Sequence, residues 1–157
     1  MLVTVVQDAP CSTGALFACV NDLARYPDWL SITHRVHAAP ALDGDPGPAW
    51  VVDLRARIGL LARSKRLRMV RAQHVEGRLV VFERKEADSR HHSGWRMSSE
   101  VEPGAASAQL TMRLEYDGSF WGPVIERLLR DEIDKCRPRL VAQALRNEVS
   151  SDDGPTR

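Results

Sequence analysis

The sequence predicts an α+β protein in which one long C-terminal helix covers one face of an antiparallel sheet of about six or seven strands. Residues 49–117 alternate apolar and polar side chains with a period of two, as strands with one solvated face do. Turn-forming residues at 76–77, 88–93 and 103–104 divide this region into hairpins. Residues 119–148 change to helical spacing, with their apolar side chains on one broad stripe.

The first forty residues predict a strand, two short helices and a further strand. Residues 2–7 are rich in β-branched side chains, which favour a strand. Ser12 or Thr13 is expected to cap the first helix. The second helix is expected to start around Pro27, because a proline disfavours helix at the residue before it. A strand over residues 33–38 follows.

The C-terminal stretch predicts a helix over residues 119–148, which is longer than most globular helices. Ser119 is a suitable N-cap, because its hydroxyl can accept a hydrogen bond from an unpaired backbone N–H. Pro123 falls in the first turn, where a missing donor does little harm. Pro138 removes one internal hydrogen bond, so a kink is expected over residues 134–138.

Composition indicates a single globular domain. The chain has 157 residues, of which 43% are hydrophobic and 27% charged, and this length is enough to bury a core. We expect residues 1–149 to form the domain and residues 150–157 to form a flexible tail. A net charge of +1 gives no reason to expect general affinity for nucleic acid. No apolar run is long enough to cross a bilayer and no signal peptide is visible, so a cytoplasmic location is expected.

Two short motifs, together with this order of elements, resemble a known superfamily. Asp22, Pro27 and Trp29 form an Asp-x4-Pro-x-Trp string, and residues 121–123 read Trp-Gly-Pro at the opening of the final helix. The chain resembles the START-like or Bet v 1-like superfamily, which includes polyketide cyclases and lipid-transfer proteins. The resemblance implies a helix-grip fold, in which a curved antiparallel sheet wraps round the long helix and leaves a cavity between them. It does not imply a reaction, because members range from carriers to cyclases.

The apolar faces of the strands and of the final helix are the expected walls of that cavity. Tryptophan and methionine are frequent among them, and both suit an adaptable apolar ligand site. The alternative for each residue is that it only fills a core. Trp29, with Pro27, is expected either to form a lid over the cavity mouth or to fasten a short helix to the sheet edge. The candidate ligand-binding residues are Trp29, Trp50, Val52, Leu54, Leu67, Met69, Phe82, Trp95, Met97, Leu110, Met112, Leu114, Ile125, Leu128, Leu129 and Glu132.

Glu132 is an acidic residue inside the apolar stripe of the final helix. On an ideal helix, at about 100° per residue, it projects close to the direction of Ile125. An unpaired buried carboxylate costs several kcal/mol, so the fold must compensate for it. Either Glu132 is paired with a basic residue of the facing sheet, for which Arg84 and Arg71 are the candidates, or it stays protonated at neutral pH and offers its proton to a ligand.

Basic side chains gather on two neighbouring strands of an otherwise near-neutral chain, with Asp53 as the only acid nearby. The cluster is expected either to dock an acidic carrier protein or an anionic lipid surface, or to form a solvated outer face that discourages edge pairing. Its members are Arg55, Arg57, Arg63, Lys65, Arg66, Arg68 and Arg71.

No motif marks any other chemistry. Both pairs of closely spaced histidines would point to opposite faces of an extended chain, and no Cys-x2-Cys pair is present, so no metal is expected. The sequence has no nucleophile elbow, phosphate loop or dinucleotide fingerprint, so no cofactor is expected. Cys11, Cys19 and Cys136 are expected to be small buried hydrophobes.

These features predict that the protein binds or transports a small hydrophobic ligand, lipid or polyketide-like, in a cavity between the sheet and the final helix. The alternative is a polyketide cyclase or aromatase that holds a carrier-bound poly-β-ketone and assists proton transfer from polar wall groups. A role in protein interaction alone is the third alternative. The scarcity of inward-facing acid–base groups favours the carrier.

Overall fold

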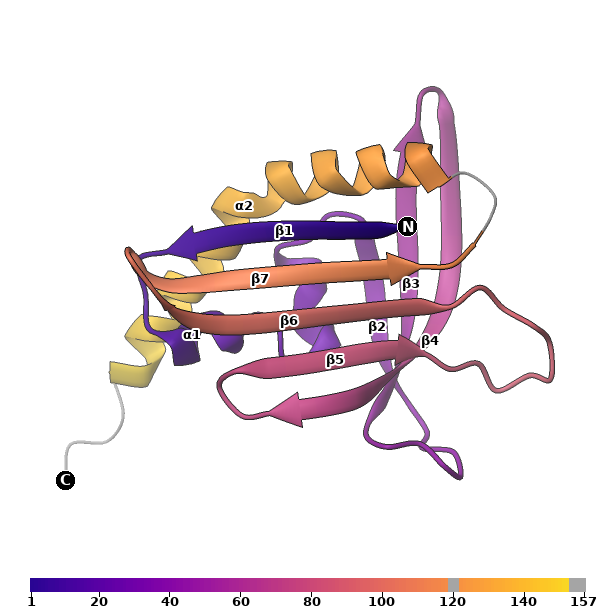
Figure 1. Ribbon diagram of the computed structural model, residues 1–157, viewed down its shortest axis with the longest axis horizontal. Coiled ribbons are helices and arrows are strands. Elements are labelled where there is room, and N and C mark those ends of the chain that lie inside the picture. Colours follow the sequence, from indigo (N-terminus) through magenta and orange to yellow (C-terminus); the bar gives the residue numbers. More distant parts are fainter. Residues whose placement is uncertain (119–121, 153–157) are drawn as a thin grey trace.

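The computed structural model describes residues 1–118 and 122–152, apart from the side chains of residues 58 and 122–125. Within these residues, seven antiparallel strands form one sheet in the order β1-β7-β6-β5-β4-β3-β2 (Figure 1). The strands are β1 (Leu2–Ala9), β2 (Thr33–Ala39), β3 (Ala49–Ile58), β4 (Leu61–Val75), β5 (Leu79–Arg84), β6 (Trp95–Gly104) and β7 (Ser107–Tyr116).

The register of the sheet decides which side chains face the long helix. Strands from β2 to β7 follow one another as antiparallel neighbours, whereas β1 pairs with β7 at the other end of the chain. Val3 lies opposite Leu114, and Val5 lies opposite Met112. Residues opposite each other across antiparallel strands share a face. The apolar members of the predicted alternation therefore gather on one side of the sheet.

The first short helix, α1 (Thr13–Phe17), follows β1 as predicted. Ser12 is its N-cap, and the Ser12 hydroxyl accepts a hydrogen bond from the backbone N–H of Ala15 at 3.1 Å. Ser12 also donates its own backbone N–H to the Glu148 carboxylate at 2.7 Å. The start of α1 is thus held to the end of the chain's last helix.

The second short helix, η1 (Leu23–Asp28), is a 3-10 helix. It starts at Leu23, so the prediction of a start around Pro27 is wrong. The reason is the cap: the Asp22 carboxylate accepts a hydrogen bond from the backbone N–H of Ala24 at 2.9 Å, which satisfies a donor at the helix start. Pro27 then lies inside a helix so short that only one internal hydrogen bond is lost.

The long helix is α2 (Gly122–Asp152). Its predicted N-cap, Ser119, lies outside the described residues. Residues 150–152, which the sequence assigns to a flexible tail, instead continue the helix, and the hydroxyls of Ser150 and Ser151 donate to backbone carbonyls one turn earlier. None of the described helices is long and apolar enough to cross a membrane.

α2 changes direction near its middle (Figure 1). Pro138 lies inside the helix, where it cannot donate to the carbonyl oxygen of Asp134 and its ring crowds the preceding turn. The bend lies in the region where the sequence predicts a kink. The first half of α2 lies over the concave face of the sheet, and the second half packs against α1. The predicted helix-grip arrangement is confirmed.

The closed part of the core lies where α1, η1 and the sheet meet. Phe17, Tyr26, Trp29 and Phe82 are among its largest fully buried side chains. The Tyr26 ring lies 5.0 Å from the Trp29 ring and 6.4 Å from the Phe82 ring, and Trp50 packs edge-on against Phe82 at 5.6 Å. This aromatic cluster is the floor on which the candidate site is built.

Candidate functional site

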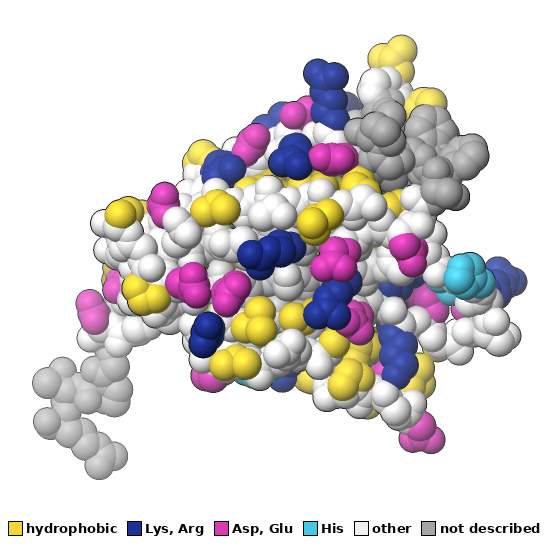
Figure 2. Space-filling model, viewed as in Figure 1, with side chains coloured by type: hydrophobic (Ala, Val, Ile, Leu, Met, Phe, Trp, Pro, Cys, Tyr) yellow, Lys and Arg dark blue, Asp and Glu magenta, His cyan; other side chains and the backbone are white. Residues whose placement is uncertain are grey.

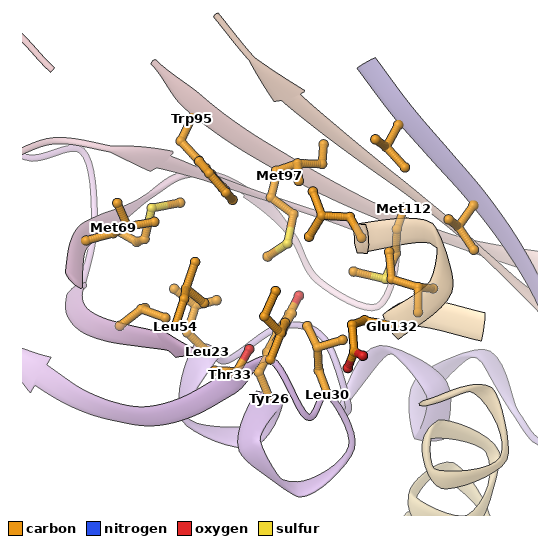
Figure 3. A pocket seen from close by; sticks show the side chains of 18 of the residues that line it. Leu23, Tyr26, Leu30, Thr33, Leu54, Met69, Trp95, Met97, Met112 and Glu132 are labelled. Carbon is orange, nitrogen blue, oxygen red and sulfur yellow. The ribbon is translucent and has the colours of Figure 1, made fainter. Parts of the chain in front are cut away.

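A cavity lies between the concave face of the sheet and the first half of α2 (Figure 3). The space between its lining atoms is about 770 Å³, including the part that is open to solvent. A water-sized sphere fits into only a small part of that volume, so the cavity is narrow. Its walls come from the sheet, η1 and α2, and almost all of the side chains are apolar.

Most of the predicted wall residues line this cavity. Val52 lies opposite Leu67, and Met97 lies opposite Leu114, so each pair presents two side chains to the helix from neighbouring strands. Leu54, Trp95 and Met97 are half-buried, whereas the other lining residues of the sheet strands β3 and β4 are buried. The predicted residues that line the cavity are Val52, Leu54, Leu67, Met69, Trp95, Met97, Met112, Leu114, Leu129 and Glu132.

The wall opposite Trp95 and Met97 comes from η1 and the chain just after it (Figure 3). Sequence reasoning missed this wall. The Asp22 cap was a visible signal that η1 exists, but no periodicity in so short a segment shows which way it faces. The residues that form the wall are Leu23, Tyr26, Leu30, Ile32 and Thr33.

Four other lining residues were also missed: Arg113, which has the outward parity of β7, and three for which the sequence did contain a signal. Val3 and Val5 belong to an alternating strand, and Ile133 lies in the apolar stripe of α2. Pairing of the first strand with the last brings the two valines beside the cavity. That pairing joins opposite ends of the chain, so strand parity alone could not assign them to the site.

Several candidates lie outside this cavity. Trp50 and Phe82 are on the predicted face but belong to the closed aromatic cluster. Leu110 is buried beside a smaller space between α2 and the strands β1 and β7. Leu128 is half-buried and is not among the cavity-lining residues. The side chain of Ile125 lies outside the described residues. Strand parity was correct for the first three, but their position along the strand places them in the core.

Trp29 is fixed in the core rather than over the cavity mouth. Only 1% of the residue is exposed, and the indole N–H donates to the carbonyl oxygen of Cys19 at 3.0 Å. Its ring packs on Tyr26, a wall residue of the cavity. Of the two predicted roles, the structure matches the fastening role and not the lid.

Glu132 projects from α2 into the cavity lining, with 20% of its side chain exposed (Figure 3). Its Oε2 accepts a hydrogen bond from the Ser31 hydroxyl at 2.6 Å, and its Oε1 lies 3.4 Å from Lys135 Nζ. The prediction that Arg84 or Arg71 pairs with Glu132 is wrong. The partners are a hydroxyl from the segment before β2 and a lysine from the same helix.

Arg84 does share the concave face, because it lies opposite Met69, but other groups hold it. Its Nε donates to the Glu86 carboxylate at 2.6 Å, and its Nη2 lies 3.1 Å from His92 Nδ1. His92 Nε2 lies 2.6 Å from the Asp88 carboxylate, and this contact holds the pKa of Asp88 below its usual range. The network orders the loop between β5 and β6 and leaves Glu132 to its own partners.

Tyr26 lines the inner side of the cavity. Its hydroxyl is not available for acid–base chemistry near neutral pH. The Tyr26 hydroxyl donates to the carbonyl oxygen of Val20 at 3.1 Å. Burial raises the pKa of Tyr26 above its ordinary value. Ser99, beneath it, is also buried, and its hydroxyl has no partner among the described residues. Among the described lining residues, the one carboxylate is that of Glu132.

The predicted basic cluster separates into buried and exposed parts. Arg68 donates to the Asp45 carboxylate at 2.7 Å and to the carbonyl oxygen of Pro40 at 2.8 Å. Its side chain is 8% exposed and that of Asp45 is 1% exposed. Arg68 is therefore an internal anchor, and its assignment to a docking patch is wrong. Arg66 is exposed and is bonded to Asp53 at 2.7 Å.

The three cysteines are free and buried, as predicted. Burial raises the pKa of Cys19 to about 12, and burial also raises the pKa of Cys11. A thiol whose pKa is raised in this way is protonated at neutral pH and is a poor nucleophile. In the described part of the chain, no group of His, Cys, Asp and Glu side chains is arranged to hold a metal ion.

A helix-grip fold with an apolar cavity defines the START-like class of proteins. The sequence matches the model of the family described as polyketide cyclase/dehydrase and lipid transport over residues 2–145. The chain belongs to this family, and the resemblance read from its motifs is confirmed. No curated protein matches the sequence significantly.

Solved structures with the same fold cover nearly the whole chain. A START superfamily protein from Mycobacterium smegmatis is 17% identical, with a TM-score of 0.67 over 92% of this chain and 97% of that one. Protein CV1439 from Chromobacterium violaceum is 12% identical, with a TM-score of 0.65 over 91% and 96%. The di-domain ARO/CYC StfQ from the steffimycin biosynthetic pathway is 10% identical, with a TM-score of 0.64 over 98% of this chain and 52% of that one.

Proposed function

We propose that the protein binds, and thereby carries, a small hydrophobic ligand in the cavity between α2 and the sheet. The observation that carries this proposal is the lining, in which Glu132 is the only carboxylate of the described residues and nearly all other side chains are apolar. A concave, mostly apolar space with a few fixed polar groups is the usual form of a small-molecule site. The family's lipid-transport members support the same assignment.

The width of the cavity restricts the ligand to a slender shape. Met69, Met97 and Met112 line the cavity, and methionine side chains adapt readily to different neighbours. A ligand that is wider than the free cavity can enter where these three side chains change rotamer. An acyl chain or a flat ring system fits this requirement better than a globular ligand does.

Glu132 supplies a polar anchor for one end of that ligand. A carboxylate has about four acceptor sites, and Ser31 and Lys135 are its partners. A hydroxyl or amide N–H of the ligand can donate to the remaining sites. We expect Glu132→Gln to weaken binding of an apolar alcohol by about tenfold, because a hydrogen bond to a charged group is stronger than one to a neutral group, while binding of the matching alkane stays unchanged.

Ligand binding is tested by tryptophan fluorescence, because Trp95 lines the cavity. Titration with fatty acids and fatty alcohols of increasing length should change the emission, and Trp95→Phe should remove that change. Leu54→Phe fills the half-buried end of the cavity and should weaken binding at least about tenfold. Leu42→Phe, at an exposed leucine in a loop, is the matched control. Emission that is indifferent to every apolar ligand, with no ligand co-purifying in native mass spectrometry, contradicts the proposal.

A second candidate function is cyclisation of a carrier-bound poly-β-ketone. It is favoured by the family's polyketide cyclases and by one specific feature, a carboxylate among the cavity walls. In this function Glu132 moves a proton at a carbon next to a ketone. Turnover of such a substrate that is lost in Glu132→Gln while binding remains assigns the enzyme role. Binding without any turnover in the wild type assigns the carrier role.

A further inference from the structure

The hairpin between β3 and β4 extends past the rest of the sheet. β2 pairs with β3 only as far as Leu54, and β5 pairs with β4 only from Met69 onward. In the strand ladder, residues 55–64, here called the ribbon, therefore pair only with each other, and the one backbone hydrogen bond from their base runs from the Arg55 N–H to the Ile32 carbonyl oxygen at 2.8 Å. In Figure 1 the ribbon extends upward beyond the other strands of the sheet. A two-stranded hairpin alone is marginally stable in water, so this extension does little for the stability of the sheet.

The tip of the ribbon carries two exposed leucines. Gly59 makes the turn with a φ of +62°, a conformation that other residues adopt only with strain. Leu60, next to it, is fully exposed, and Leu61 is 60% exposed. Figure 2 shows hydrophobic side chains standing clear of the surface at this end of the molecule. Adjacent leucines at a protruding tip indicate a contact with an apolar partner.

Three arginines lie directly behind the leucines. Arg55, Arg57 and Arg63 are exposed and, with Ser64, surround a shallow hollow on the ribbon. No acidic side chain among the described residues forms an ion pair with any of the three, and Asp53, the acid nearest along the strand, is bonded to Arg66. The ribbon thus presents an apolar end followed by unpaired positive charge.

We propose that the ribbon docks on an anionic lipid bilayer. Leu60 and Leu61 insert at the boundary between head groups and acyl chains, and the arginines behind them bind lipid phosphates. The order of the two features favours a membrane over an acidic protein, because the apolar side chains lie at the tip and the charges lie behind them along the two strands. An acidic protein surface would instead meet the charges first.

The docked ribbon brings the cavity close to the lipid. Leu54 lines the cavity and is the residue before the ribbon begins. Its cross-strand neighbour Lys65 lies with its Nζ 5.6 Å from the centre of the Trp95 ring and 5.4 Å from that of Tyr116, at the same end. Leu54 and Trp95 are half-buried. Given the proposed ligand-binding function, docking places this end of the cavity where an apolar ligand passes between bilayer and protein.

Vesicle co-sedimentation of the whole chain tests the docking. The wild type should sediment with vesicles of phosphatidylcholine and phosphatidylglycerol at low salt, and not with phosphatidylcholine alone. Changing Arg55, Arg57 and Arg63 to Glu together should weaken this binding on the order of 100-fold, since each basic residue near an anionic surface contributes about fivefold. Changing Leu60 and Leu61 to Ser should also weaken binding. This loss should persist at high salt, because salt screens the contribution of the arginines but not that of apolar insertion.

Matched control variants lie at the opposite end of the molecule. Arg78, Arg139 and Arg146 are exposed, so changing them to Glu gives the same change in net charge. Leu145 and Val149 are exposed apolar residues on α2, and changing them to Ser matches the tip variant. Both controls should bind vesicles as the wild type does. Thermal midpoints close to that of the wild type show that each variant is folded.

Three results would overturn the docking proposal. The wild type fails to bind anionic vesicles at low salt; the control variants lose as much binding as the ribbon variants; or the arginines prove to be needed for an acidic carrier protein and not for vesicles. Ligand affinity measured without vesicles separates this proposal from the proposed function. The ribbon variants should bind the ligand as tightly as the wild type does. A wild type that binds no apolar ligand would contradict the proposed function but would leave the docking proposal untouched.

Discussion

The two halves of α2 belong to one continuous helix but have different surroundings. In the second half, Leu140 and Ala144 are buried in the hydrophobic core. Asn147 donates to the carbonyl oxygen of Ala15 at 3.1 Å, and Glu148 accepts from Ser12, so that half is also held by hydrogen bonds to the start of α1. Among the described residues, this half packs closely on its neighbours apart from the small space beside Leu110.

In the first half, the helix stands over a cavity. Leu129 is buried, but Glu132 and Ile133 are half-buried, and all three line the open space. The apolar stripe is continuous along both halves, so the stripe itself does not decide between core and cavity. The elements beneath the stripe decide: α1 packs under the second half, whereas the described chain leaves a cavity under the first. One half therefore stabilises the fold while the other remains available for a ligand.

The largest expected effect comes from a pair of identical substitutions on the two halves. Leu140→Ala should lower the free energy of unfolding by about 2–5 kcal/mol, since it opens a cavity in a closed core. Leu129→Ala should cost clearly less, because its side chain already borders an empty space. Urea unfolding of both variants measures the difference. Equal costs would show that the first half is packed as tightly as the second.

The sheet beneath the open half has its own anchor in Arg68 and Asp45. The Arg68 guanidinium, with the Leu42 N–H, holds the pKa of Asp45 well below its usual range. The charged form thus stabilises the fold above the unfolded-state pKa of about 4, and that stability is lost as the pH falls toward the folded-state value. Asp45→Asn should lower the thermal midpoint by several degrees at pH 7. The difference from the wild type should shrink below about pH 4; a constant difference would contradict the ion pair.

A smaller effect is expected at the hydrogen bonds that hold the second half of α2. Asn147→Ala removes a donor to Ala15 and leaves that carbonyl without this partner, so it should cost about 1 kcal/mol. Gln143→Ala is the control, since the Gln143 side chain bonds only to residues of its own helix. A control that loses as much stability as the variant would assign the effect to helix propensity.

The smallest effect on stability is expected at Glu132. Glu132→Gln keeps an acceptor for the Ser31 hydroxyl and loses only the contact with Lys135, so the free energy of unfolding should change by less than about 1 kcal/mol. Urea unfolding without a ligand measures this change. A much larger loss would make Glu132 a structural residue and would weaken its assignment as a ligand anchor.

Period-two alternation was sufficient to predict one wall of the site. It placed Val52, Leu67 and Met97 on the concave face without any knowledge of pairing partners, because side chains on a strand alternate between faces. It could not separate Trp50 from the cavity residues, since both share a face and differ only in their position along the strand. Whether a given position along the strand faces core or cavity depends on where η1 and α1 pack against the sheet.

The parts that the sequence did not reveal depend on contacts between distant segments. Glu132 is bonded to Ser31, and Arg68 is bonded to Asp45, and neither Ser31 nor Asp45 lies in a periodic stretch. Reasoning from strand parity offered Arg84 for Glu132 and placed Arg68 on an exposed face. Each error came from a loop residue whose place is set by the folded chain and not by local spacing.

The pairing of β1 with β7 has a consequence for the order of folding during synthesis. β1 is an edge strand whose only neighbour in the sheet is β7, with Leu2 opposite Glu115 and Ala9 opposite Ala108. While the ribosome makes the chain, β1 has no partner in the sheet until residue 107 and those after it have left the exit tunnel. Within this sheet, β1 is thus made before the other strands but is among the last to be paired, and its edge is open to other chains during that time.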